Sequence, residues 1–399
     1  MAQLTKTWND NRQIFIPAAY IIAVLLLLAW LGPIVAEQRA ARLVQSTITG
    51  VLVGGIYALI ALGIVIINKA SGVFNFAHGW MMLLGGLIFY SFFVSTAAGG
   101  VNPIAALLLS AATVFMALTT NGWRALRQPR TLATGALISI VLTIGLLVGG
   151  AEAQLFRALL GATIGAVLTG LMVERFAIRP LIGQPLFAMV LMTLAVAEVL
   201  HGVTQLTWGS VEIPLGVFAG VRDLGIPSPI RIDANETLGG MIIVRTELLI
   251  AFILAIVAFM LFVVFFRYTS VGLSMRATAE NQKLAQSVGL RVRTILAVAW
   301  AIAALLAATA GVLQGGATTL SQNMPLLALR AFPAVLLGGL ESVGGALVGG
   351  LVIGLVQEWA TLLFPGTQAG TELAPYVILM VVLVIRPDGL FGQKRIERV

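Results

Sequence analysis

Residues 48–67 read ITGVLVGGIYALIALGIVII, an apolar run without a single charged side chain. A helix needs about 20 consecutive, mostly apolar residues to cross the hydrocarbon core of a bilayer, and this run supplies them. Comparable unbroken runs recur along the chain, which excludes the alternating pattern of a membrane β-barrel. The sequence therefore predicts an all-α, polytopic membrane protein.

About 10–12 apolar segments are expected, including broken or re-entrant helices. The full or near-full spans are predicted at residues 14–35, 48–67, 77–98, 103–119, 132–150, 158–173, 186–207, 248–266, 294–313 and 343–364. The two shorter segments are predicted at residues 326–340 and 373–385. The first span is too long for the core of a signal peptide, so residues 1–47 are interpreted as an N-terminal anchor helix and a loop. Because most connections are short, residues 1–399 are expected to form a single membrane domain.

The composition excludes several classes of protein. The chain is 59% hydrophobic and 10% charged, whereas soluble domains carry about 25% charged residues, so neither an ordinary soluble protein nor a disordered one fits. It has no cysteine and two histidines, which excludes thiolate zinc sites, iron–sulfur clusters and cysteine nucleophiles. No G-x-x-x-x-G-K-[ST] sequence is present to form a P-loop. We therefore expect no catalytic residues, no metal site and no cofactor.

The basic residues predict an orientation. If the N-terminus is cytoplasmic and all twelve segments cross, 17 of the 24 Lys and Arg residues fall on the cytoplasmic side. The positive-inside rule favours this arrangement, which places both termini in the cytoplasm. It also accounts for the net charge of +8 without a nucleic-acid partner. Residues 208–247 then form an external loop, and residues 267–293 form a basic cytoplasmic loop.

Two segments are expected to interrupt helices at membrane depth. Residues 68–79 join two apolar helices and include Asn75 and His78, and a later glycine-rich segment includes Gly338 and Gly339. Non-helical backbone inside a membrane is tolerated only against protein or water, and it often marks a transport path. The alternative is that both segments are tight cytoplasmic turns.

The predicted span at residues 186–207 carries Glu198 and His201, whose spacing of three places them on one helix face. Ionisable groups inside spans usually face the protein interior or a cavity, because facing lipid is costly. They are interpreted as a polar patch on a solute path, and a structural hydrogen bond remains an equal alternative. The predicted path residues are Asn75, His78, Glu198, His201, Gly338 and Gly339.

The basic loop contains a segment of helical character at residues 274–289. Ser274 can cap its start and Gly289 can close its end, with alanine and long polar side chains between them. The segment is too polar to cross a membrane, yet a span tethers it at each end. It is interpreted as a helix on the cytoplasmic face, either a surface for a partner or a plain solvated helix.

Four motifs, in this order, resemble those of one transporter family. They are Asn75-Phe76-Ala77-His78-Gly79, Glu174-Arg175-x-x-x-Arg179-Pro180-Leu181, Arg276-Ala277-x-Ala279-Glu280-Asn281 followed by Ala285 and Gly289, and a tail from Ala334-Val335-Leu336-Leu337-Gly338-Gly339 to Arg386-Pro387-Asp388-Gly389-Leu390-Phe391-Gly392. The chain thereby resembles the permeases of branched-chain amino-acid ABC importers, of the LivH-type subunit. Residues 104–157 depart from the family pattern and look like an extra pair of helices.

The resemblance implies a permease subunit that moves a small solute, foremost branched-chain or other hydrophobic amino acids, across a bacterial-type inner membrane. It implies two cytoplasmic ATPase subunits, a second permease subunit that is homologous or identical, and a periplasmic or extracellular substrate-binding protein. Residues 267–293 would be the coupling loop that docks on an ATPase. Its contact residues would be Arg276, Ala279, Glu280, Asn281, Ala285 and Gly289.

Two other functions are weighed against the permease. An ion-coupled secondary transporter of small amides or carboxylates would also use broken helices and an intramembrane Glu198. Such a carrier has no need of a docking helix in the cytoplasm. A membrane enzyme would need clustered catalytic groups, and the spans contain almost none.

The orientation is testable because the chain has no cysteine to give background labelling. Single cysteines at Asn235 and Gln282 are expected to lie outside and inside the cell, respectively. An impermeant thiol reagent added to intact cells should label the Asn235→Cys variant alone, and the Gln282→Cys variant should react only after lysis. Labelling of the second variant but not the first in intact cells would mean that the topology is inverted.

Overall fold

The computed structural model of the protein describes residues 32–33, 35–36, 38–94, 100–148, 151–210, 212–218, 226–280, 282–366 and 368–392. In this part of the chain, seven helices are long and apolar enough to cross a membrane, and four more apolar helices are shorter. Almost all the remaining regular structure is helical as well, which confirms the all-α expectation. The anchor span predicted at residues 14–35 falls almost entirely outside the described residues.

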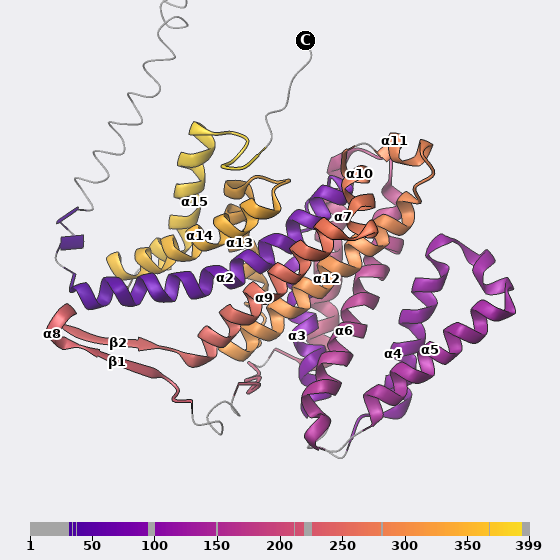
Figure 1. Ribbon diagram of the computed structural model, residues 1–399, viewed down its shortest axis with the longest axis horizontal. Helices are drawn as coiled ribbons and strands as arrows, with labels where there is room; N and C mark the ends of the chain where they lie inside the picture. The colour runs from indigo at the N-terminus through magenta and orange to yellow at the C-terminus, as the bar shows by residue number, and fades with distance from the viewer. Residues whose placement is uncertain are drawn as a thin grey trace, which may run out of the picture.

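Every apolar segment predicted from residue 48 onward coincides with a helix (Figure 1). The helices are α2 (Ala40–Ser71), α3 (His78–Val94), α4 (Pro103–Leu118), α5 (Pro129–Leu147), α6 (Gln154–Met172), α7 (Leu186–Trp208), α9 (Thr246–Tyr268), α12 (Val292–Ala317), α13 (Pro325–Gly338), α14 (Val343–Leu363) and α15 (Gln368–Ile385). Two shorter helices, α10 (Ser270–Glu280) and α11 (Gln282–Ser287), lie between α9 and α12. Residues 36–47 were expected to form a loop, and this is wrong from residue 40 onward, because α2 already begins there.

Helix α2 is the central element of the fold, since most of its residues are buried inside the chain. Helix α14 lies against it with almost no side chain between the two backbones. A Cβ added to Gly354 would lie 2.5 Å from the Cα of Gly54, and one added to Gly350 would lie 2.4 Å from the Cα of Ala58. Small residues at this spacing allow close contact between membrane helices, where dispersion replaces the hydrophobic effect as the driving force.

Helices α9, α12, α13 and α15 pack directly on this pair, and the remaining spans pack on those helices or on one another. Helix α12 packs on α2, α3 and α6, and α13 and α15 pack on α14. Helices α4 and α5 pack on each other and on α6, and in Figure 1 they form an arm at the side of the molecule. Residues 104–157, predicted as an extra pair of helices, contain most of this arm and the start of α6.

The predicted external loop at residues 208–247 contains a hairpin that the sequence analysis did not anticipate. Strands β1 (Ile230–Ala234) and β2 (Gly240–Val244) pair antiparallel, with Ile230 opposite Val244, and the short helix α8 (Asn235–Leu238) joins them. The side-chain amide of Gln45 on α2 continues the ladder: its nitrogen donates to the carbonyl of Ile243 at 2.5 Å, and its oxygen accepts from the Ile243 N–H at 2.6 Å. This contact holds the N-terminal end of α2 against the hairpin.

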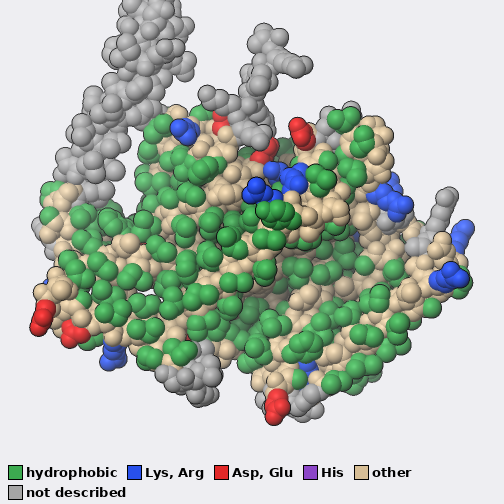
Figure 2. Space-filling model, in the orientation of Figure 1, with side chains coloured by type: hydrophobic (Ala, Val, Ile, Leu, Met, Phe, Trp, Pro, Cys, Tyr) green, Lys and Arg blue, Asp and Glu red, His purple; other side chains and the backbone are tan. Residues whose placement is uncertain are grey.

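Loops that the sequence predicts on one side of the membrane lie together in the structure. Lys69 Nζ donates to the carbonyl of Glu341 at 3.1 Å, and both belong to the side that carries α10 and α11, called here the α10 side. The opposite side, which carries β1 and β2, is called here the hairpin side. In Figure 2 most of the visible Lys and Arg side chains gather toward the upper edge, which is the α10 side. The assignment of the α10 side to the cytoplasm stays a prediction of the positive-inside rule.

From the close contact between α2 and α14, we predict the effect of adding one methyl group at Gly354. Gly354→Ala should lower the stability of the purified protein by about 1–3 kcal/mol, because the added Cβ meets backbone that cannot move aside. Gly344→Ala, in the same helix, is the matched control, since a Cβ there has no atom within 4 Å. Thermal unfolding in detergent measures both variants. Equal melting temperatures for the two would contradict the packing described here.

Candidate functional site

The segment between α2 and α3 is a compact turn built around Asn75. Gly72 ends α2 with a φ of 71°, which is the left-handed conformation that glycine adopts without strain. The side chain of Asn75 is buried, and its Oδ1 accepts from the N–H of Ala77 at 3.0 Å. The carbonyl of Asn75 accepts from the N–H of His78 at 3.3 Å. Asn75 thus supplies local hydrogen bonds to backbone that has left the helix.

Thr193 of α7 holds the same turn from outside. Its hydroxyl donates to the carbonyl of Phe74 at 3.2 Å and accepts from the N–H of Phe76 at 3.3 Å. The rings of Phe74 and Phe76 each stack on Phe332 of α13, with ring centroids 5.1 Å apart in both pairs. The turn is therefore clamped between α7 and α13, which links two helices that are distant in sequence.

His78 begins α3 and is fully buried in the chain. Its ring occupies the notch left by Gly63 of α2, where an added Cβ would lie 2.4 Å from the ring carbon Cε1. Neither ring nitrogen has a hydrogen-bond partner in the part of the chain that the structure describes. The position makes His78 a contact between α2 and α3, and its place on a solute path stays a prediction.

Gly338 and Gly339 lie at the other predicted break, between α13 and α14. A Cβ on Gly338 would meet the carbonyl oxygen of Gly345 at 2.1 Å, so the two backbones touch. Gly339 has a φ of 98°, and a Cβ there would lie 2.7 Å from the nitrogen of Gly392. Both glycines are buried by close backbone contacts, and their role on a path likewise stays a prediction.

Glu198 and His201 differ from these four residues because they lie at an open face of α7. The Glu198 carboxylate is 79% exposed and lies 3.5 Å from Nδ1 of His201. The ring of Trp80 from α3 stacks on the His201 ring at a centroid distance of 4.2 Å. The predicted i,i+3 contact between the two side chains is present. Among the described residues, no three His, Asp or Glu side chains are grouped so as to hold a metal ion.

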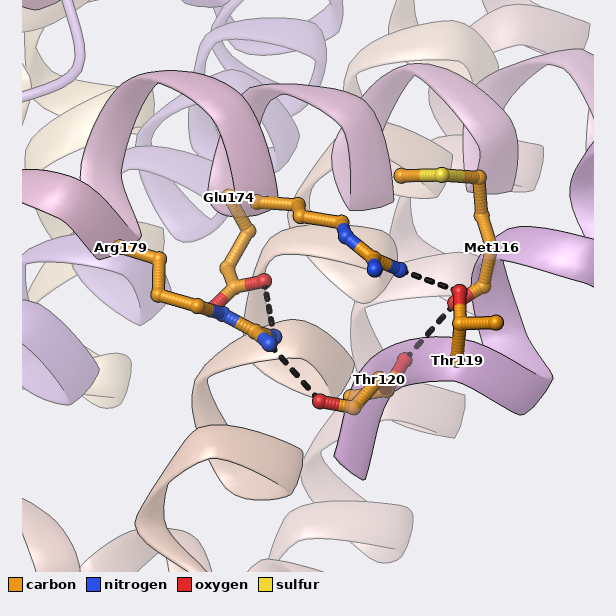
Figure 3. Close-up of polar contacts among 6 residues, drawn as sticks. Met116, Thr119, Thr120, Glu174 and Arg179 are labelled. Carbon is orange, nitrogen blue, oxygen red and sulfur yellow. Dashed lines mark hydrogen bonds and ion pairs between the residues drawn. The ribbon is translucent and has the colours of Figure 1, made fainter. Parts of the chain in front are cut away.

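The Glu174-Arg175-x-x-x-Arg179 motif forms a polar cluster that the sequence reading did not identify as a contact site. It lies in a π-helical turn, Val173–Ile178, at the end of α6. Glu174 is 1% exposed, and its two oxygens accept from Arg179 at 3.0 and 2.7 Å. Arg179 also donates to the carbonyl of Thr120 at 2.7 Å (Figure 3). The motif thereby ties the α4 end of the arm to α6.

The predicted coupling residues lie on the α10 side. Arg276 donates to the carbonyl of Phe266 in α9, and its guanidinium lies 5.3 Å from the centre of the Phe266 ring. Ala279 is half-buried and Glu280 is exposed, so both are at the surface of α10. Asn281 lies outside the described residues. Met275, one turn before Ala279 on α10, is buried against the spans.

The end of α11 confirms Gly289 as its closing residue. Gly289 has a φ of 88°, and its N–H donates to the carbonyl of Gln286 at 3.0 Å. The N–H of Leu290 donates to the carbonyl of the buried Ala285, also at 3.0 Å. This pair of bonds is the Schellman pattern that ends many helices.

The start of the loop helix was predicted incorrectly. Ser274 is not the cap, because its hydroxyl donates to the carbonyl of Ser270 inside α10 at 2.9 Å. Thr269 takes the capping role instead, and its hydroxyl accepts from the N–H of Gly272 at 3.1 Å. The single helix expected at residues 274–289 is two helices, α10 and α11. Gly272, which follows the cap, packs directly on the Phe266 backbone of α9, a tertiary contact that the local sequence does not reveal.

Comparison with known proteins gives a consistent set of relatives. Residues 46–385 match the family described as branched-chain amino acid transport system, permease component. The high-affinity branched-chain amino acid permease protein LivH of Escherichia coli K12 is 26% identical over 361 residues, which are 89% of this chain and 97% of the relative. The corresponding BraD protein of Pseudomonas aeruginosa is 26% identical over 357 residues with the same coverage. The ribose import permease RbsC of Escherichia coli K12 is 26% identical over 270 residues, which are 63% of this chain and 76% of the relative. No solved structure matches the chain significantly.

The buried Glu174–Arg179 pair generates a stability prediction. Glu174→Gln should destabilise the protein by about 3 kcal/mol, because it leaves the Arg179 guanidinium without its compensating charge in a buried site. Glu372→Gln is the control, since its pair with Arg330 is exposed and contributes little. The measurement is thermal unfolding of both variants in the same detergent. If Glu372→Gln proved the more damaging of the two, the structural weight given to the buried pair would be wrong.

Proposed function

Because this chain belongs to the family of permease components of branched-chain amino acid transport systems, we propose that it imports small hydrophobic amino acids across an inner membrane. The match over residues 46–385 carries this conclusion, since it spans nearly all the described helices. The chain is a permease subunit of an ABC importer, and the relatives do not favour the ion-coupled alternative. The solute and the partners are the proposed part.

The importer is proposed to contain two ATPase subunits, a second permease subunit and an external substrate-binding protein. The sequence has no P-loop, so ATP must be hydrolysed by other chains. Helices α10 and α11 supply a surface for such a chain: Leu284 is 62% exposed and Val288 is 70% exposed, next to the exposed Glu280. Exposed apolar side chains beside charged ones are typical of a site that binds another protein.

The contacts of α10 explain how movement at this surface would reach the membrane helices. Arg276 binds the backbone at the end of α9 through the Phe266 carbonyl. Met275 lies with Val65, Lys69 and Val343 around a small pocket between α2, α9, α10 and α14. Because α10 is fastened to three spans, a displacement of α10 would move them together. This is what coupling of ATP-driven closure to transport requires.

The hairpin side is proposed to receive the binding protein. The hairpin projects from the bundle in Figure 1 and carries the exposed charges Arg231, Asp233 and Glu236. Its backbone is fixed to α2 through Gln45. Binding of the substrate-binding protein to the hairpin would therefore exert a force on α2, which also contacts α10.

The coupling assignment is tested by reversing one charge. Glu280→Arg is expected to reduce co-purification of the ATPase and ATP-driven uptake at least tenfold, because it adds a positive charge to a basic docking surface. Glu152→Arg is the control, since it makes the same exchange at an exposed position between α5 and α6, outside both proposed docking surfaces. Co-purification, uptake and ATP hydrolysis are measured in vesicles that contain the reconstituted importer. Full uptake by the Glu280→Arg variant would refute the docking role of α10.

A further inference from the structure

Helix α7 is the least buried of the seven long apolar helices among the described residues. One face of α7 packs on the rest of the chain, through Thr193, Ala197, Leu200 and Thr204. A second face carries large exposed apolar side chains, which are Val199, Val203 and Leu206. The second face has the apolar character of a surface that contacts lipid. A third face of α7 is also exposed.

In its C-terminal half the third face carries small and polar exposed side chains, which are Ala195, Glu198, Gly202 and Gln205, whereas toward the helix start the same face carries the exposed Leu191 and Leu194. We call the first set the α7 polar stripe; its spacing of three and four residues places its members in one row along the helix. Beyond Gly202 there is open space, because a Cβ there would have no neighbouring atom within 4 Å. No described part of this chain therefore covers the row at Gly202.

Glu198 lies halfway along α7 and near the middle of the row. At this depth a carboxylate faces a cavity or protein, because hydrocarbon does not solvate it. No Lys or Arg side chain is paired with Glu198 within the described ranges. The weakly buried helices α5 and α9 carry no acidic side chain at mid-length, so this open carboxylate distinguishes α7 from them.

His201 orients this carboxylate. The side-chain nitrogen of Gln205 lies 2.9 Å from Nε2 of His201, and with that amide donating, the ring proton sits on Nδ1. Nδ1 is the atom that lies 3.5 Å from Glu198, and Trp80 holds the ring from its other face. His201 thus positions the Glu198 carboxylate, and most of the Glu198 side chain remains exposed.

We propose that the α7 polar stripe lines the solute path opposite the second permease subunit, and that Glu198 binds the ammonium group of the amino-acid solute. An ammonium group is a compact cation with three donors, and an open carboxylate is its natural acceptor. A solute that carries only a carboxylate would be repelled. The inference rests on the proposed function, and it names the solute group that this chain itself recognises.

The first experiment asks whether the row is hydrated. The cysteine-free chain allows Gly202→Cys and its lipid-face neighbour Val203→Cys to be made singly and reconstituted with the whole importer. Two thiol reagents are used, one bearing a trimethylammonium group and one a sulfonate. The Gly202→Cys variant should react with both, the cation faster, and the Val203→Cys variant with neither. Adding Glu198→Gln should lower the ratio of cation to anion rates about tenfold.

The second experiment asks which solute group binds. Isoamylamine carries the ammonium group without a carboxylate, and isocaproate carries the carboxylate without an ammonium group. Each compound is added in excess, in the absence of the binding protein. Isoamylamine should slow the reaction of the Gly202→Cys variant with the trimethylammonium reagent, and isocaproate should not. Glu198→Gln should abolish that protection. Equal protection by both compounds, or protection that survives Glu198→Gln, would overturn the ammonium site.

The outcomes separate this inference from the proposed function. If ATP-driven uptake continues while the Gly202→Cys variant is as inert as the Val203→Cys variant, the path lies elsewhere and the importer assignment stands. If uptake by the wild-type chain needs no ATPase, the proposed function itself fails. If the Gly202→Cys variant reacts but its labelling rates are unchanged by Glu198→Gln, the path still runs along α7. In that case the Glu198 carboxylate is not part of it.

Discussion

The backbone contact between α2 and α14 is the constraint on which the other contacts depend. Lipid solvates apolar side chains as well as a neighbouring helix does, so two such helices associate through dispersion and polar bonds at short range. Glycines on both helices bring the backbones together, and Tyr57 donates to Gln357 at 2.7 Å within the same interface. Because α2 is buried along most of its length, its position decides where α9, α12 and α13 can pack.

The molecule divides into a closely packed centre and open flanks. Asn75, His78, Gly338 and Gly339 belong to the centre, where each supports a turn or a contact between helices. Glu198 belongs to a flank, where the chain provides a polar row but nothing to cover it. The proposed pairing with a second permease subunit would use both parts: the rigid centre to transmit movement and the open face to contact the partner.

Much of the architecture was predictable because hydropathy over long runs identifies spans reliably, and the segments from residue 48 onward became helices. The hairpin was missed because its strands are short and no two-residue turn such as Asn-Gly joins them. The buried side of each helix was harder to predict than the helix itself. A helix such as α3 is apolar all round, so periodicity does not reveal which side is buried. His78 and Glu198 therefore looked alike in sequence, although one is enclosed and the other is open.

The arm formed by α4 and α5 has a consequence for assembly in two dimensions. Its α4 end is fastened to α6 through Arg179 and Thr120, and α4 packs along α6. Annular lipid is thereby displaced from that edge of the subunit, and the footprint in the membrane plane is wider there. A second subunit diffusing in the same bilayer meets the arm first if it approaches from that edge. If the chain pairs with a second permease subunit as proposed, the arm limits the directions from which that subunit can reach the spans.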